Sequence, residues 1–153
     1  MKQFLLFLIF SVINFGGLAF GSWLMDNGPL SDWYTNLNQA PWTPPGWIFG
    51  VAWTIIMLCF SVYLSKLFTV IKTKQLITVY ILQVVLNVSW NFIFFNLHQV
   101  LFAIMTIILL TVVIFYMFIK YKKTANNISF LLLPYMVWLI IATSLNAYIL
   151  IYN

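Results

Sequence analysis

The distribution of nine charged side chains constrains this chain more than any other feature of its sequence. All seven basic residues are lysines, and they gather at position 2, at positions 66 to 74 and at positions 120 to 123. The two acids, Asp26 and Asp32, lie in the first long connection. The remaining sequence holds five long apolar stretches, and a helix needs about 20 such residues to cross a bilayer. The pattern therefore predicts an all-α integral membrane protein, a bundle of five transmembrane helices.

Composition supports the same fold class. The chain is 64% hydrophobic and only 6% charged, and a soluble domain of 153 residues could not keep such a surface hydrated. Five crossings and their connections use residues 1–153 as a single domain. Lysine-rich loops remain in the cytoplasm, so we expect the N-terminus inside and the C-terminus outside. Because the lysines flank the crossings and form no basic face, we expect them to contact lipid and not nucleic acid.

The expected crossings are separated by one long and three short connections. The first crossing begins near the N-terminus and could be read as a cleaved secretory signal peptide, which would leave four crossings. Its apolar length exceeds the usual 7–15 residues of a signal-peptide core, which argues against cleavage. We place the crossings at residues 4–25, 46–67, 76–97, 100–119 and 128–152.

The long connection, residues 26–45, carries strong local signals and is called the lid below. It begins with a turn signal at Asn27-Gly28-Pro29, and Ser31 or Asp32 can cap a short helix through Leu37. Its Pro44-Pro45 pair forces extended backbone before the second crossing, and Pro45 suits a first helical turn. Loops of this length commonly act as lids or binding segments. We therefore expect a stiff, ordered lid on the outer face.

Two glycine pairs have the spacing that lets membrane helices approach closely. Gly17 and Gly21 lie in the first crossing, and Gly46 and Gly50 open the second. Small residues four apart are common at helix–helix contacts in membranes, so both pairs predict close packing.

Polar and aromatic side chains form helical stripes inside the crossings. Hydrocarbon offers them no partner, so each must face another helix or a cavity. At ~1.5 Å per residue, Trp53, Asn87 and Trp90 lie about 10–15 Å from the outer ends. Trp138 then lies near mid-membrane, and Asn146 lies close to the outer end. One interpretation is that these residues are the packed interior of the bundle. Together under an aromatic lid, they also describe a pocket for a flat, largely apolar ligand.

Three motifs in order give the chain a resemblance to a known family. Trp42-Thr43-Pro44-Pro45 ends the lid, Leu86-Asn87-x-x-Trp90 lies in the third crossing, and Pro134-Tyr135-x-x-Trp138 lies in the fifth. With these residues the chain resembles the tryptophan-rich sensory protein family, also called the translocator protein or peripheral-type benzodiazepine receptor family. The resemblance covers about three quarters of the chain. Further matches are Trp33-Tyr34, Leu37, Pro41, Phe49, Trp53, Tyr80, Gln83, Phe94-Phe95, Ala142 and Leu145-Asn146.

The resemblance implies a five-helix bundle that binds porphyrins and synthetic isoquinoline or benzodiazepine ligands in its outer half. It implies aromatic contacts from Trp53 and Trp138, a polar contact from Asn87, a small wall residue at Ala142 and a lid residue at Trp42. It requires no cofactor, favours a homodimer and suggests the inner membrane of a bacterial cell. Together with the depth estimates, it gives the predicted site residues Trp42, Trp53, Asn87, Trp90, Trp138, Ala142 and Asn146.

The chain departs from the family pattern at two places. Sterol-binding relatives have a C-terminal apolar-Tyr-basic pattern, and no basic residue follows Lys123 here. The segment from Leu58 through Tyr63 to Lys66 also fits the apolar-Tyr-basic pattern, but this pattern is a weak indicator of sterol binding. The residue after the third-crossing tryptophan, often Ser in the family, is Asn91.

Two other functions compete with that of a porphyrin-binding sensor. Some bacterial relatives are reported to promote light- and oxygen-dependent breakdown of protoporphyrin, and Trp53 and Trp138 are the candidate reactive residues for that chemistry. The crossings hold no carboxylate or Arg, so no acid–base pair supports an enzyme. A small-molecule transporter is the third hypothesis, although no charged residue within a crossing could couple ions and no half-repeat is visible.

Metal binding has little support in the sequence. The one cysteine, Cys59, lies in an apolar stretch without a second thiol or a metal-binding cluster. His98 lies in a tight outer turn, where an interfacial polar role is favoured over axial ligation of a haem iron. We therefore predict no metal site.

Overall fold

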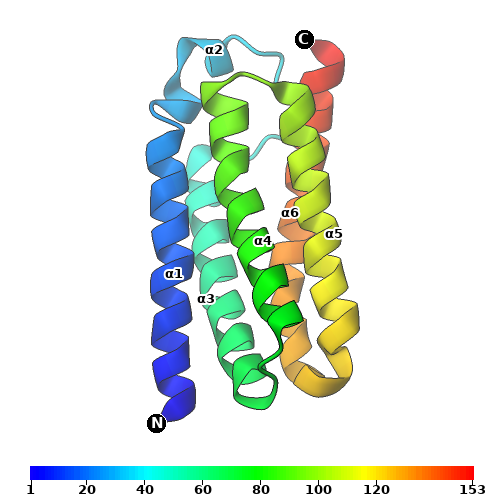
Figure 1. Ribbon diagram of the computed structural model, residues 1–153. Helices are drawn as coiled ribbons and strands as arrows, with labels where there is room; N and C mark the ends of the chain where they lie inside the picture. Colours follow the sequence, from blue (N-terminus) through cyan, green and yellow to red (C-terminus); the bar gives the residue numbers. More distant parts are fainter.

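The computed structural model describes residues 1–153, and every regular element in it is helical (Figure 1). Two short 3-10 segments and one π-helical segment join or extend the α-helices. The α-helices are α1 (Lys2–Leu24), α2 (Asp32–Thr35), α3 (Gly46–Val70), α4 (Lys74–Asn91), α5 (Val100–Ala125) and α6 (Leu133–Tyr152). The other segments are η1 (Gly28–Leu30), the π-helical η2 (Phe92–Asn96) and η3 (Asn126–Leu132).

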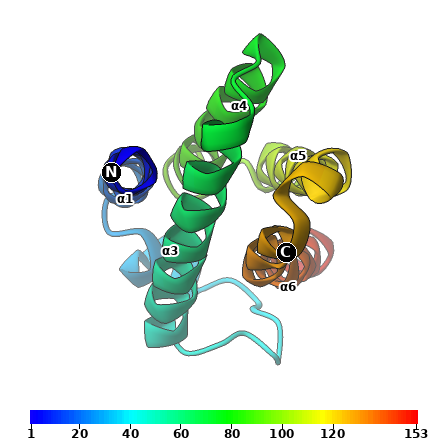
Figure 2. The same cartoon turned by 90° about the horizontal axis from the view of Figure 1, so that it is seen from below.

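The five long helices form a ring in which each packs against its two neighbours, and α3 also contacts α5 across the bundle. Helix α1 contacts α3 and α4, α5 contacts α4 and α6, and α3 closes the ring against α6 and η3. Figure 2 shows α1 on one side of the bundle and α5 with α6 on the other. Fully buried side chains of α3 and α5 form much of the core, among them Phe60, Tyr63, Leu64, Ile114 and Met117.

The structure separates the charges between the two ends of the bundle. The N-terminus, the α3–α4 link and the α5–α6 connection lie at one end (Figure 1). All seven lysines lie in the α3–α4 link or in the ends of the helices that meet there. Asp26 and Asp32 lie at the other end with the lid, the α4–α5 turn and the C-terminus. We call these the lysine end and the lid end.

Long apolar helices make this an integral membrane protein. Four continuous helical segments have the length and composition to cross a membrane: Lys2–Leu30, Gly46–Val70, Lys74–Asn96 and Val100–Tyr152. The last has 53 residues and contains both α5 and α6, which run in opposite directions through the bundle (Figure 1).

Local capping explains where two helices begin. Ser31 caps α2, because its Oγ accepts a hydrogen bond from the backbone N–H of Tyr34 at 3.3 Å. Thr73 caps α4 in the same way through the N–H of Leu76. Pro45 occupies the N-cap of α3 with extended backbone, so the expectation that it lies within the first helical turn was wrong by one residue. Proline lacks an N–H, and it stands here where the helix needs none.

The end of α4 nearer the lid contains a feature that the sequence pattern did not predict. Residues 92–96 are π-helical, with the N–H of Leu97 bonded to the carbonyl of Phe92 at 3.0 Å. His98 follows with a positive φ of 55°, which lets the chain reverse into α5 within three residues. Single π-helical turns of this kind are frequent at functional sites.

The two glycine pairs differ in how closely another helix approaches them. A Cβ on Gly21 would lie 2.7 Å from Asn91 Nδ2, and one on Gly17 would lie 3.7 Å from Val88, so this pair does let α1 approach α4. A Cβ on Gly46 or Gly50 would meet nothing within 4 Å. The expected close helix contact at the second pair was therefore wrong, because its small residues face open space.

Candidate functional site

Two aromatic pairs join α3 to α6 in the half of the bundle nearer the lid. Phe49 of α3 meets Trp138 of α6 edge to face, with ring centroids 5.2 Å apart. Trp53, one turn further along α3, meets Tyr135 of α6 at 5.8 Å, again edge to face. This geometry brings the positive edge of one ring to the negative face of the other. The two pairs form an aromatic seam between the helices, and we call Phe49, Trp53, Tyr135 and Trp138 the aromatic seam below.

Two polar contacts extend this region to α4. Trp90 Nε1 donates to Asn146 Oδ1 at 3.4 Å, and Asn146 Nδ2 donates to the carbonyl of Ala142 at 3.0 Å. Trp90 also stacks on Phe94 of the π-helical segment, with centroids 5.4 Å apart. Because α4 and α6 are linked here through one tryptophan and one buried amide, the position of Trp90 depends on Asn146.

The predicted site residues do not all lie together. Trp138 and Ala142 belong to one buried hydrophobic cluster, and Trp53 and Trp90 pack against it. Ala142 is buried one turn after Trp138 on the same face of α6. Asn146 joins the group through Trp90.

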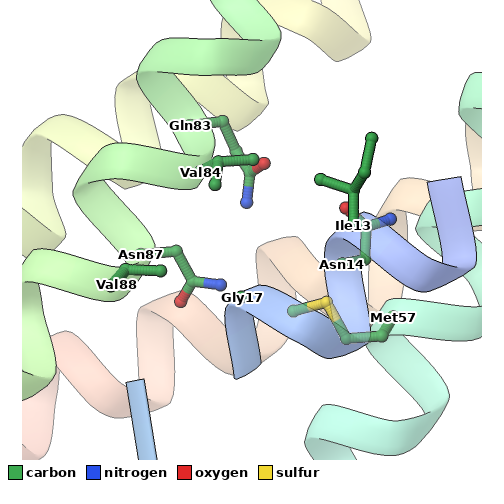
Figure 3. A pocket seen from close by; sticks show the side chains of 8 residues that line it. All are labelled: Ile13, Asn14, Gly17, Met57, Gln83, Val84, Asn87 and Val88. Atoms are coloured by element: carbon green, nitrogen blue, oxygen red, sulfur yellow. The ribbon is translucent and has the colours of Figure 1, made fainter. Parts of the chain in front are cut away.

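Asn87 instead lines a small cavity toward α1, with Gln83 of its own helix and Gly17 of α1 (Figure 3). The volume of this cavity is about 10 Å³. Such a space holds about one water molecule.

Trp42 lies outside the bundle, in the lid, with about half of its surface exposed. Its Nε1 donates to Ser144 Oγ at 3.2 Å, and its ring meets Tyr148 edge to face at 5.4 Å. Both partners belong to α6, so Trp42 fixes the lid to the C-terminal turns of that helix.

A second contact fixes the lid to the end of α6. The backbone N–H of Asn38 donates to Asn153 Oδ1 at 2.8 Å, and Asn153 Nδ2 donates back to the Asn38 carbonyl at 3.3 Å. Asn38 Nδ2 also donates to the carbonyl of Tyr152 at 3.0 Å. We call this set the Asn38–Asn153 contact, and nothing in the sequence pattern indicated it.

The first part of the lid packs on the α4–α5 turn. Trp33 stacks on His98, with centroids 4.1 Å apart and planes 13° from parallel, and it meets Phe94 edge to face. Tyr34 packs on Phe94 and Phe95, and burial raises the pKa of its phenol above the ordinary value. The His98 ring is therefore a stacking partner of the lid in this structure.

The groups available to a ligand are aromatic rings and amides. No three His, Cys, Asp or Glu side chains come close enough together to hold a metal ion. Phe49 and Tyr135 belong to the family motifs, but the sequence did not predict them as site residues. Their edge-to-face contacts with Trp138 and Trp53 now make them part of it.

A wide apolar groove also runs along the outside of the bundle between α4 and α5. Its volume is about 700 Å³, and its lining is almost wholly hydrophobic. Because it lies between two membrane-length helices, it faces the hydrocarbon of a bilayer. The lining residues are Leu86, Ile93, Leu97, Gln99, Phe102, Met105, Thr106, Ile108, Leu109 and Val112.

Comparison with known proteins identifies the family. Residues 8–152 match the sequence model of the TspO/MBR family, which is nearly the whole chain. The chain belongs to the TspO/MBR family. The match includes the aromatic seam and the lid, so these features lie within the part of the chain that defines the family.

Named relatives span distant organisms. The chain is 31% identical over 129 residues to the tryptophan-rich protein TspO of Chlorobaculum tepidum, covering 82% of each chain. It is 26% identical over 115 residues to the tryptophan-rich sensory protein of Cereibacter sphaeroides, covering 75% of this chain and 73% of the relative. It is 29% identical over 121 residues to the human translocator protein, covering 74% of this chain and 70% of the human chain.

Proposed function

We propose that this TspO/MBR family member is a membrane binding protein and sensor for porphyrins and similar flat, largely apolar molecules. The single observation that carries the proposal is the aromatic seam between α3 and α6, with its four rings at centroid distances of 5.2 and 5.8 Å. Planar aromatic ligands stack on such rings, and each aromatic contact adds about 0.5–1.5 kcal/mol beyond the buried area. The ligand is the partner of this site, and its chemistry needs no additional cofactor.

The surroundings of the seam suit a ligand with polar groups at its edge. Asn146 and Trp90 offer an amide and an indole N–H on the α4 side. Ala142 keeps the α6 wall small one turn beyond Trp138. We assign the porphyrin ring to the aromatic seam and its polar edge groups to the Asn146 amide and the Trp90 indole N–H.

Entry of a ligand requires the outer half of the bundle to open. The seam rings contact one another directly, so a flat molecule must part Phe49 from Trp138 or Trp53 from Tyr135. The lid is held by Trp42 and by the Asn38–Asn153 contact, which are exposed and involve few hydrogen bonds. Exposed contacts of this kind open at low free-energy cost.

We further propose five crossings, with the lysine end in the cytoplasm and the lid end outside. The lysines favour the cytoplasmic side under the positive-inside rule. The opposite directions of α5 and α6 support two crossings within the segment Val100–Tyr152. For a bacterial chain, this puts the lid on the outer side of the inner membrane. A reporter active only outside the cytoplasm, fused after Asn153, should be active. Activity of a cytoplasm-only reporter there would contradict this orientation.

A porphyrin titration tests the proposed function. Protoporphyrin IX should quench the tryptophan fluorescence of the purified protein in a saturable manner in darkness, because Trp53 and Trp138 lie in the seam. Absence of saturable quenching with folded protein would contradict the proposal.

The same sample in light tests the alternative functions. Porphyrin consumed in light but stable in darkness would favour photochemical breakdown, with Trp53 and Trp138 as the reactive residues. Porphyrin flux across liposomes that contain the protein would favour transport. If the protein is a sensor, we expect it to bind porphyrin without breaking it down in light and without transporting it.

A further inference from the structure

We propose that the cavity between α1, α3 and α4 is a binding site for one internal water molecule, held by the side-chain amides of Gln83 and Asn87. The inference is independent of the proposed porphyrin function. Figure 3 shows both amides reaching from α4 toward α1 at the level of Gly17. The cavity lies among helices that cross the membrane, where bulk water does not reach buried polar groups.

The side-chain amide of Gln83 lacks one hydrogen-bond partner. Its side chain is 1% exposed, and its Nε2 donates to the Tyr135 hydroxyl at 2.9 Å. Its Oε1 is buried and accepts no hydrogen bond from any protein group. An unpaired buried polar atom costs about 1–3 kcal/mol. Exchanging the amide nitrogen and oxygen would leave an unpaired donor in place of an unpaired acceptor, so the need remains either way.

The neighbouring amide, Asn14, makes its hydrogen bonds to other groups and none to Gln83. Asn14 Nδ2 donates to Ser61 Oγ at 2.9 Å, and Asn14 Oδ1 accepts from the Tyr80 hydroxyl at 2.9 Å. These bonds tie α1 to α3 and α4 on one side of the cavity. Asn87 on the other side makes no side-chain hydrogen bond through its own amide, so Gln83 and Asn87 are the lining residues whose amides lack a partner.

The size of the cavity selects the ligand. Its volume of about 10 Å³ matches a single water and excludes larger polar molecules. Its lining offers the two to four polar partners that an internal water uses. Gly17 creates the room, because it places no side chain between α1 and the two amides.

Two adjacent glycines provide a matched test. A Cβ on Gly17 would lie 3.7 Å from Val88 and 3.9 Å from Val84, which is ordinary contact, and both valines line the cavity. Gly17→Ala therefore adds a methyl group at the wall of the cavity without a clash, and we expect it to displace the water. Gly16→Ala makes the same chemical change on the same helix where nothing lies within 4 Å. Any gain in helix propensity is shared by the two variants.

The expected result is a lower midpoint of thermal unfolding for Gly17→Ala than for Gly16→Ala, by at least about 2 °C. In a Gln83→Met background this difference should shrink by half or more, because one of the two amides that need the water is gone. A midpoint for Gly17→Ala equal to or above that of Gly16→Ala would overturn the proposal, since filling a dry cavity adds contacts.

A direct measurement decides the question even if a variant fails to fold. A high-resolution structure of the unaltered protein should show one ordered water within about 3.2 Å of the Gln83 amide. A cavity without solvent density, or a Gln83 amide whose two polar atoms are both paired with protein groups, would overturn the proposal.

Discussion

The two halves of helix α3 differ sharply in packing. All eight buried residues of this 25-residue helix lie from Ile56 onward, toward the lysine end. The ten residues before Ile56 include none, although they contain Phe49 and Trp53 of the aromatic seam. Phe60 and Tyr63 in the inner half are 0% exposed. One helix therefore combines a close-packed scaffold with a loosely packed half beneath the lid.

The same difference appears in the glycines and in the hydrogen bonds. A Cβ on Gly17 or Gly21 would meet α4, whereas a Cβ on Gly46 or Gly50 would meet nothing within 4 Å. The buried bonds from Asn14 to Ser61 and Tyr80 join three helices in the scaffold. The bonds of the lid to α6 are exposed or partly exposed. We infer that the scaffold carries the stability and that the outer half is free to rearrange around a ligand.

Truncating one phenylalanine in each half gives the largest expected contrast. Phe60→Ala should destabilise the protein by about 3–5 kcal/mol, because the side chain is fully buried among Tyr63, Tyr80 and Tyr135. Phe49→Ala should cost clearly less stability, since Phe49 is only half-buried, while weakening porphyrin binding. Denaturation and porphyrin titration of both variants measure the contrast. Equal loss of stability would remove the distinction between the halves.

Enlarging the small residue of the α6 wall should affect binding more than folding. Ala142→Thr adds two heavy atoms at a buried position beside Trp138, and overpacking costs about 1–3 kcal/mol. Porphyrin affinity should fall tenfold or more while α6 persists in circular dichroism. Ala142→Gly serves as the control that removes bulk from the same wall. Unchanged affinity and stability for Ala142→Thr would exclude this part of α6 from the site.

Removing a seam ring should have a moderate effect on affinity. Trp138→Ala should weaken porphyrin binding by about 0.5–1.5 kcal/mol beyond the loss of buried area. Trp23→Ala is the control, because Trp23 is 73% exposed near the end of α1 and stacks only on the exposed Phe20. Fluorescence titration of both folded variants is the measurement. If Trp138→Ala binds with wild-type affinity, Trp138 does not contact the ligand.

Releasing the lid should have the smallest effect on stability and a visible effect on rates. Asn153→Ala removes two hydrogen bonds to Asn38, both exposed, so the loss of stability should stay below about 1 kcal/mol. Porphyrin should associate and dissociate faster in stopped-flow experiments. The control is Asn127→Ala, an exposed asparagine at the lysine end. Identical rates for the two variants would show that the Asn38–Asn153 contact does not limit entry.

The sequence predicted the helices well because their signals are physical and local. The long apolar stretches without charged residues located the membrane segments. Ser31 was correctly predicted as a candidate cap of the short helix in the lid. The start of α3 at Gly46 and of α5 at Val100 also matched. The end of α5 did not, because the helix continues through the lysines to Ala125 and leaves the following crossing to begin as a 3-10 segment. Lysine is a good helix former, so its charge marks the membrane boundary but not the helix end.

The candidate site was harder to predict because it depends on tertiary pairing. Helical spacing grouped Trp138 with Ala142 on one face of α6, and that grouping agrees with their shared burial. Spacing alone could not show that Asn87 faces α1 instead of the seam, since the rotation of α4 is set by its neighbours. The pairing of Asn38 with Asn153 joins residues 115 positions apart and leaves no periodic signal.

Hydrogen–deuterium exchange with and without protoporphyrin IX, in darkness, tests the central claim most directly. The account predicts that bound porphyrin slows exchange in the lid, in residues 46–57 of α3 and in residues 138–148 of α6. Exchange in residues 58–70 of α3 and along the outward groove between α4 and α5 should stay unchanged. Protection confined to that groove or to the scaffold half of α3, under conditions where porphyrin is shown to be bound, would contradict the account.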